Sequence, residues 1–262
     1  MDCLRRNQIP ILAGLALVAL AIVVDLATTD PWRPRALSSR CERPWRPHAF
    51  LREPTNALSN MAFCAVAIRM LLLQTTASWS TIYALATWTT GITSFWYHAS
   101  QSIDAAECDL VALVYLLAVV MATTVRAWLR SEAAFVGIVV VSVPFTYVLA
   151  DGTVFGWAGL LASGATVLGV TAVAAVLAIR RAGEAHTAAF VRAAVAMVFA
   201  LIAWIPEEIM HVCVPHGGQP SLHAVFHVLA AVAIAYHHEF LCGIERAAND
   251  APAKSCPLTE TA

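Results

Sequence analysis

The chain has 262 residues, of which 60% are apolar and 13% carry charge, and its formal net charge is −1. An average soluble domain has about 25% charged residues, so this composition excludes a disordered chain, a nucleic-acid-binding protein and an ordinary cytosolic enzyme. Seven cysteines are scattered without a CxxC pair, so neither a disulfide scaffold nor a zinc ribbon is expected.

Eight apolar runs are each long enough to cross a membrane. A spanning helix needs about 20 largely apolar residues, because the hydrocarbon core of a bilayer is about 30 Å thick. Helices suit lipid because they satisfy their own backbone hydrogen bonds. The sequence therefore predicts an all-α, polytopic membrane helical bundle. Its predicted spans are 9–27, 56–74, 79–98, 108–129, 133–150, 156–180, 187–209 and 221–242.

The predicted spans divide the chain into three parts. Residues 1–30 form an N-terminal transmembrane helix, which follows Arg5 and Arg6 and has an apolar stretch too long for a typical signal peptide. Residues 31–243 form the main membrane domain, and residues 244–262 form a cytoplasmic tail that we expect to be disordered. No soluble domain is predicted.

The positions of arginine and lysine predict the orientation. With both termini in the cytoplasm, every outer connection except the segment 28–55 lacks arginine and lysine, as the positive-inside rule requires. A composition rich in arginine and alanine is typical of a bacterial genome, so we expect the bacterial inner membrane. The exceptional outer segment contains Arg33, Arg35, Arg40, Arg43, Arg46 and Arg52.

Polar residues gather at one predicted depth, near the outer ends of several spans. Ionisable groups at membrane depth are costly, so each is a functional candidate. This convergence is independent of the charge rule that predicts the orientation. The gathered residues are Glu53, Asn56, Ser59, Asn60, His98, Asp109, Glu207, Glu208, His223 and His227.

Three histidines in this group form a candidate metal site. His223 and His227 are spaced i, i+4, which places both imidazoles on one face of a helix, one turn apart. His98 lies at the predicted depth for a third ligand. Three histidines with one open position are the pattern of catalytic zinc, which lowers the pKa of its water to about 7. The alternative for an HxxxH pair alone is ordinary packing and hydrogen bonding.

Two polar residues complete the expected chemistry. Asp109 follows His98 across a short loop and is a candidate general base. Ser94 lies one turn before His98, on the same helix face, where its hydroxyl can hydrogen-bond the reacting oxygen. Taken alone, Asp109 is better explained as a charge at a helix start, and Ser94 as a hydroxyl bonded to its own backbone. Their shared location favours a site.

Other histidines receive different interpretations. His237 and His238 lie about 15 Å further along the last span, at 1.5 Å per residue, and we expect them at the membrane interface rather than at the metal. Glu208 and His211 form an ExxH pair like those of di-iron bundles, but the sequence has no second ExxH.

Three blocks of residues, taken in order, resemble the alkaline ceramidase family, within the seven-helix membrane hydrolases that include the adiponectin-type receptors. The likeness covers roughly residues 39–242. Its blocks are Cys41 and Glu42 with residues 53–60 (EPTNALSN), residues 94–98 (SFWYH) with Asp109 eleven residues on, and residues 223–227 (HAVFH).

The resemblance implies a seven-helix barrel that binds zinc through His98, His223 and His227, with Ser94 and Asp109 beside the metal. It implies hydrolysis of the amide of ceramide to a sphingoid base and a free fatty acid, with the lipid entering laterally from the membrane. The seven helices of the family would be predicted spans two to eight, so the first span is an additional N-terminal helix.

The resemblance also implies a calcium site in the outer segment, where this chain departs from the family. Glu42 and Glu53 match the acidic ligands, whereas other ligand positions hold Ser39, Arg40 and Pro44. Calcium prefers six to eight oxygen ligands, so we expect weak binding at most. Glu207 and His211 stand where related chains often have Asp and Cys, so the external disulfide of the family would require Cys41 to pair with a shifted partner such as Cys213.

Two functions therefore compete. The first is a zinc-dependent amide hydrolase acting on ceramide or another N-acyl lipid, and the second is a lipid-sensing receptor with weak or no hydrolysis on the same scaffold. The joint presence of Ser94, Asp109 and the three histidines favours the enzyme. A haem-binding redox protein is a third class, but two histidines on one helix face suit zinc better. The expected partner is a membrane lipid, and no nucleic acid is expected.

Overall fold

The computed structural model describes residues 51–73, 78–150, 156–182, 186–210, 212 and 221–250. The predicted first span and the chain beyond residue 250 lie outside these ranges. The described residues are helical and contain no strand. Their helices are α2 (Pro54–Ser59), α3 (Met61–Leu72), α4 (Ser78–Ser100), α5 (Ile103–Leu129), α6 (Glu132–Ala150), α7 (Gly156–Ala182), α8 (Thr187–Glu208) and α9 (Leu222–Asp250).

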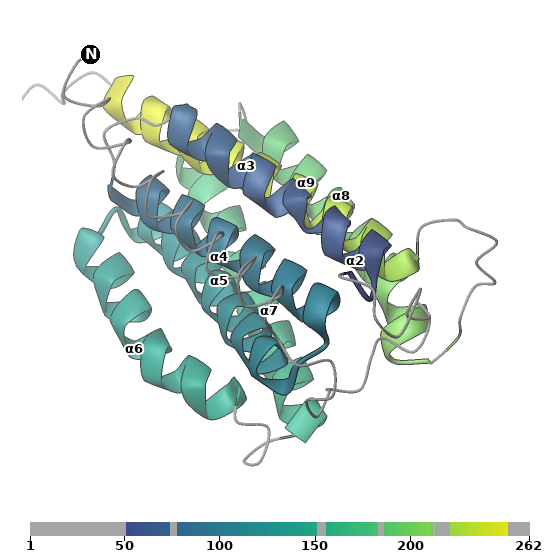
Figure 1. Cartoon of the computed structure of the whole chain (residues 1–262). Coiled ribbons are helices and arrows are strands. Elements are labelled where there is room, and N and C mark those ends of the chain that lie inside the picture. Colours follow the sequence, from purple (N-terminus) through teal and green to yellow (C-terminus); the bar gives the residue numbers. More distant parts are fainter. Residues whose placement is uncertain are drawn as a thin grey trace, which may run out of the picture.

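The helices form an elongated bundle in which the long elements run side by side (Figure 1). Helices α2 and α3 meet at Asn60 and together make one apolar segment. This arrangement confirms the predicted all-α membrane bundle. Four helices in the described ranges are long and apolar enough to cross a membrane: Pro54–Leu72, Ile103–Leu129, Thr187–Glu207 and Leu222–Ala248.

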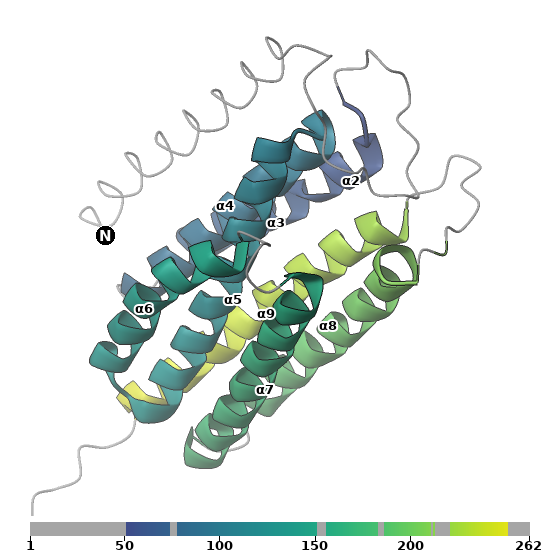
Figure 2. The ribbon, with the colours of Figure 1, turned by 90° about the horizontal axis from the view of Figure 1, so that it is seen from below.

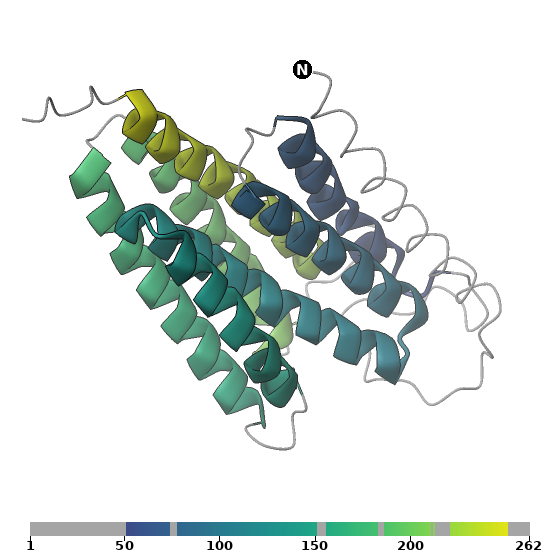
Figure 3. The same ribbon diagram turned by 90° about the vertical axis from the view of Figure 1, so that its left-hand side faces the viewer.

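Helix α9 is the central element of the bundle. It packs against α2, α3, α5, α7 and α8, and it lies between α5 and α8 in Figure 2. Figure 3 shows α8 alongside α9 over much of its length. Helix α6 packs mainly against α5 and stands at the edge of the bundle (Figure 1). Large apolar side chains remain exposed on the outer faces, as lipid contact requires: Val136, Val140, Val141, Val173, Val191, Val195, Val198 and Ile202.

Helix α9 continues beyond its predicted end at residue 242. The helical backbone extends to Asp250. At this end the Glu245 carboxylate accepts hydrogen bonds from Trp79 Nε1 at 3.1 Å and from Arg126 at 3.2 Å. These hydrogen bonds connect the polar last turns of α9 to α4 and α5. They explain why the helix continues beyond its apolar stretch.

His237 and His238, which we expect at the depth of the membrane interface, have buried side chains inside the bundle. His237 lies between the hydroxyls of Tyr83 and Thr124, each 3.0 Å from a ring nitrogen. The Nε2 atom of His238 lies 2.8 Å from the hydroxyl of Ser80. Because this part of α9 faces α4 and α5, its histidines enter the bundle and bond there to hydroxyl groups.

Candidate metal centre

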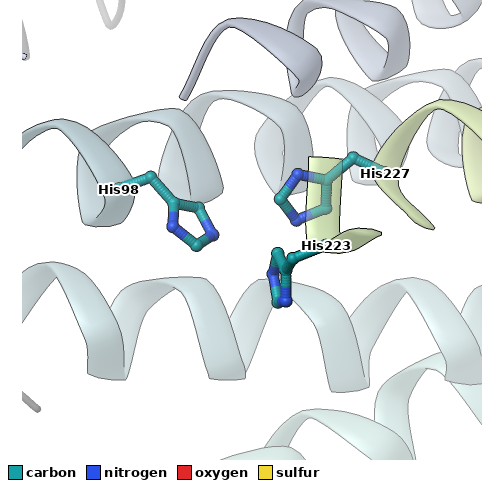
Figure 4. A group of neighbouring side chains, drawn as sticks. All are labelled: His98, His223 and His227. Atoms are coloured by element: carbon teal, nitrogen blue, oxygen red, sulfur yellow. The ribbon is translucent and has the colours of Figure 1, made fainter. Parts of the chain in front are cut away.

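Three histidines meet inside the bundle at the end where α4 finishes and α9 begins. His98 comes from the last turns of α4, while His223 and His227 come from the first turns of α9. All three are buried, and one ligand nitrogen from each lies within 4.8 Å of the other two. In Figure 4 their rings converge on one another from the two helices. This is the convergence that the spacing predicts.

The chemistry of this donor set fits a metal ion. The centres of the rings are separated by 5.0 Å for His98 and His223, by 5.1 Å for His98 and His227, and by 4.6 Å for His223 and His227. Imidazole nitrogens are good ligands for zinc, copper, iron and nickel. Within the described ranges, this is the one group of three or more metal-binding side chains close enough to share an ion.

The short helix α2 contacts two of these rings. Glu53, directly before α2, places Oε2 2.6 Å from Nδ1 of His98, and both side chains are 1% exposed. The Oε1 atom of Glu53 accepts a hydrogen bond of 2.6 Å from Gln101 Nε2. Ser59, the last residue of α2, lies 2.8 Å from Nδ1 of His227. The sequence places Glu53 and Ser59 at the right depth, but it does not indicate these contacts.

Glu207 at the end of α8 fixes the start of α9. Its carboxylate accepts hydrogen bonds from the backbone N–H groups of Leu222, at 2.9 Å, and His223, at 3.0 Å. A carboxylate at this position satisfies backbone donors that a helix start leaves without intrahelical partners. Ser221 donates a hydrogen bond to the side chain of Asn56, which joins α9 to α2. The sequence indicates Glu207 only as a polar residue at this depth and does not indicate that it caps α9.

Ser94 and Asp109 come together beside the histidines, as expected. Ser94 is buried one turn before His98 on α4, and its hydroxyl hydrogen-bonds the carboxylate of Asp109 on α5. The tight turn between the two helices makes this possible. Gln101 adopts a left-handed backbone with φ of 53°, and Ser102 caps α5 by accepting a 3.2 Å hydrogen bond from the backbone of Ala105.

The remaining sequence predictions have different outcomes. Asp104, the neighbouring carboxylate, is exposed in the first turn of α5. Asn56 and Asn60 are buried, and Asn60 donates a 2.8 Å hydrogen bond to the backbone oxygen of Asn56. Calcium binding and the disulfide stay predictions, because several residues concerned lie outside the described ranges: Cys41, Glu42, His211 and Cys213.

Comparison with known proteins gives one family. The family model described as Ceramidase matches residues 36–256. The match therefore includes all of the described helices, the three histidines, and the pair formed by Ser94 and Asp109. No curated protein sequence matches the chain significantly.

Proposed function

The chain belongs to the ceramidase family, whose members hydrolyse the amide bond of ceramide, and we propose that it does so with a zinc ion held by His98, His223 and His227. The observation that carries this proposal is the buried triangle of imidazoles. Three histidine ligands with an open fourth position are typical of catalytic zinc. When bound in such a site, zinc acts as a Lewis acid and makes water nucleophilic near neutral pH.

Asp109 is the proposed proton acceptor. Hydrolysis of an amide adds the oxygen of water to the acyl carbon and breaks the C–N bond, while protons move from the water to the leaving nitrogen. A carboxylate near the reacting centre can take the first proton and return it to the amine. Asp109 is only partly buried and lies beside Ser94, one turn from His98. This position supports the role.

Ser94 is proposed to hold the oxygen of the reacting carbonyl. A hydroxyl has one hydrogen to donate and two lone pairs to accept. Without substrate, the hydrogen bond of Ser94 is made with Asp109. With ceramide bound, the same hydroxyl would turn to the acyl oxygen. The products are a sphingoid base and a free fatty acid, and the substrate would reach the site from the surrounding lipid.

We also propose that the end of the bundle carrying the histidines faces away from the cytoplasm. Basic residues concentrate at the opposite ends of the helices. Arg69 lies in the last turn of α3, Arg126 in the last turn of α5, Arg130 directly after α5, and Arg192 near the start of α8. The positive-inside rule assigns such ends to the cytoplasm.

The proposed function is tested with the full chain purified in detergent or nanodiscs. Fatty-acid release from ceramide is measured before and after stripping with a metal chelator, and again after zinc is returned. We expect activity to disappear and then return. Lipid binding without any release, with zinc present, would instead support the receptor alternative, whereas a haem absorption band in the purified protein would contradict the zinc centre.

A further inference from the structure

We propose that Glu53 and Ser59, at the two ends of α2, are positioning residues that orient His98 and His227 for metal binding. The inference rests on the proposed function, because it concerns the ligands of that metal. It assigns Glu53 a role at the centre itself rather than in an outer calcium site.

The contact between Glu53 and His98 fixes which nitrogen of His98 carries the proton. An ionised carboxylate only accepts hydrogen bonds, so Nδ1 of His98 must be the donor across the 2.6 Å contact. The lone pair of the neutral ring is then on Nε2, which is the atom left to bind a metal. A backbone hydrogen bond also joins the two residues: the N–H of Glu53 donates to the carbonyl oxygen of His98 at 3.1 Å.

Ser59 determines which nitrogen of His227 carries the proton. Its hydroxyl has one hydrogen, which it donates to the backbone oxygen of Asn56 at 2.8 Å. The second contact, 2.8 Å from Nδ1 of His227, must therefore run in the other direction, with Nδ1 donating and the Ser59 oxygen accepting. His227 thus adopts the same tautomer as His98 and also presents Nε2.

The surroundings of Glu53 are built to hold its carboxylate in place. Gln101 donates a hydrogen bond to Oε1 of Glu53 at 2.6 Å. Asn56 donates one at 3.3 Å to Oε2, the oxygen that also contacts His98. Gln101 keeps a left-handed backbone that residues other than glycine rarely adopt. Glu53 stands directly before Pro54 at the start of α2, yet its side chain makes no capping bond to that helix. Its carboxylate is directed to His98 instead.

This arrangement has a consequence for calcium. Both oxygens of Glu53 already accept hydrogen bonds from protein donors. A cation bound by both oxygens of Glu53 would compete with these donors for the lone pairs of the carboxylate. A carboxylate that hydrogen-bonds a metal-binding histidine fixes the orientation of the ring and raises its basicity. Loss of such a partner typically weakens metal affinity by about 10–100-fold.

The test measures the zinc dissociation constant of the purified full chain by competition with a chromogenic chelator. We expect Glu53→Gln to weaken zinc binding by about 10–100-fold and Ser59→Ala to weaken it less. Glu53→Asp, which keeps the charge, should restore part of the affinity. The matched control is Glu245→Gln, because Glu245 also accepts two side-chain hydrogen bonds but lies at the other end of α9. It should leave zinc affinity unchanged.

Cobalt substitution supplies a second readout. The visible spectrum of bound Co²⁺ reports ligand geometry, so it should change in Glu53→Gln and Ser59→Ala but not in Glu245→Gln. If Glu53→Gln does not fold, Ser59→Ala tests the same claim. Wild-type protein that binds no zinc would overturn the proposed function and this inference together. Two results would overturn this inference alone. One is wild-type zinc affinity in both Glu53→Gln and Ser59→Ala. The other is stabilisation of the wild type, but not of Glu53→Gln, by micromolar calcium.

Discussion

Gly91 of α4 lies so close to α3 that a Cβ atom on it would come within 2.9 Å of Cβ of Phe63. It would also come within 2.9 Å of the sulfur of Cys64 and 3.1 Å of the backbone oxygen of Asn60. Phe63 packs edge-on against the ring of His227, with the ring centres 6.4 Å apart. The missing side chain at Gly91 therefore lets α3 and α4 approach each other next to the candidate metal centre.

Replacing Gly91 by alanine should destabilise the protein. Alanine favours a helix by up to about 1 kcal/mol over glycine, but forcing atoms into a packed interior costs about 1–3 kcal/mol. We expect a lower melting temperature in detergent. Gly137→Ala on α6 is the control, because its Cβ would meet nothing within 4 Å, and it should melt at the same temperature or higher. An unchanged melting temperature in Gly91→Ala would refute the tight contact.

Asp109→Asn should retain zinc but lose hydrolysis. The substitution keeps the size of the side chain and removes the basic oxygen, and Asp109 is outside the three-histidine group. General-base catalysis typically contributes roughly 10²–10⁴-fold, so ceramide turnover should fall by that factor. Asp104→Asn, at an exposed position in the same helix, should be nearly silent. Loss of turnover in Asp104→Asn with normal turnover in Asp109→Asn would mean that the base is misassigned.

The proposed orientation can be measured by thiol labelling. Single cysteines are introduced in a cysteine-free background at Asp104, in the first turn of α5 near the candidate metal centre, and at Ser131, just after the opposite end of α5. We expect a membrane-impermeant maleimide to label Asp104→Cys in intact spheroplasts and Ser131→Cys only after lysis. The reverse pattern would place the histidines at the cytoplasmic side.

The sequence predicts the helices well because their apolar runs have membrane-spanning length, and it predicts the three histidines because helical spacing brings His223 and His227 together. It fails at the end of α9, where polar residues continue the helix through contacts with other helices. Glu245 is such a residue, and no local pattern indicates its bonds to Trp79 and Arg126.

The same limitation applies to the partners of the site. Glu53 and Ser59 lie 45 and 168 residues from the histidines they contact. A contact between helices depends on rotation and crossing geometry, which one sequence does not specify. His237 and His238 show the reverse case. A polar pair near a span end resembles an interfacial pair, but the hydroxyls of Ser80, Tyr83 and Thr124 provide the partners that allow burial.

The central claim, that His98, His223 and His227 bind a catalytic zinc ion, is tested most directly by metal analysis of two matched variants. His227 and His238 are both buried on α9, and each lies 2.8 Å from a serine hydroxyl. We predict about one zinc per chain in the wild type and in His238→Gln, and loss of most of the zinc in His227→Gln. Equal zinc content in the two variants would contradict the claim.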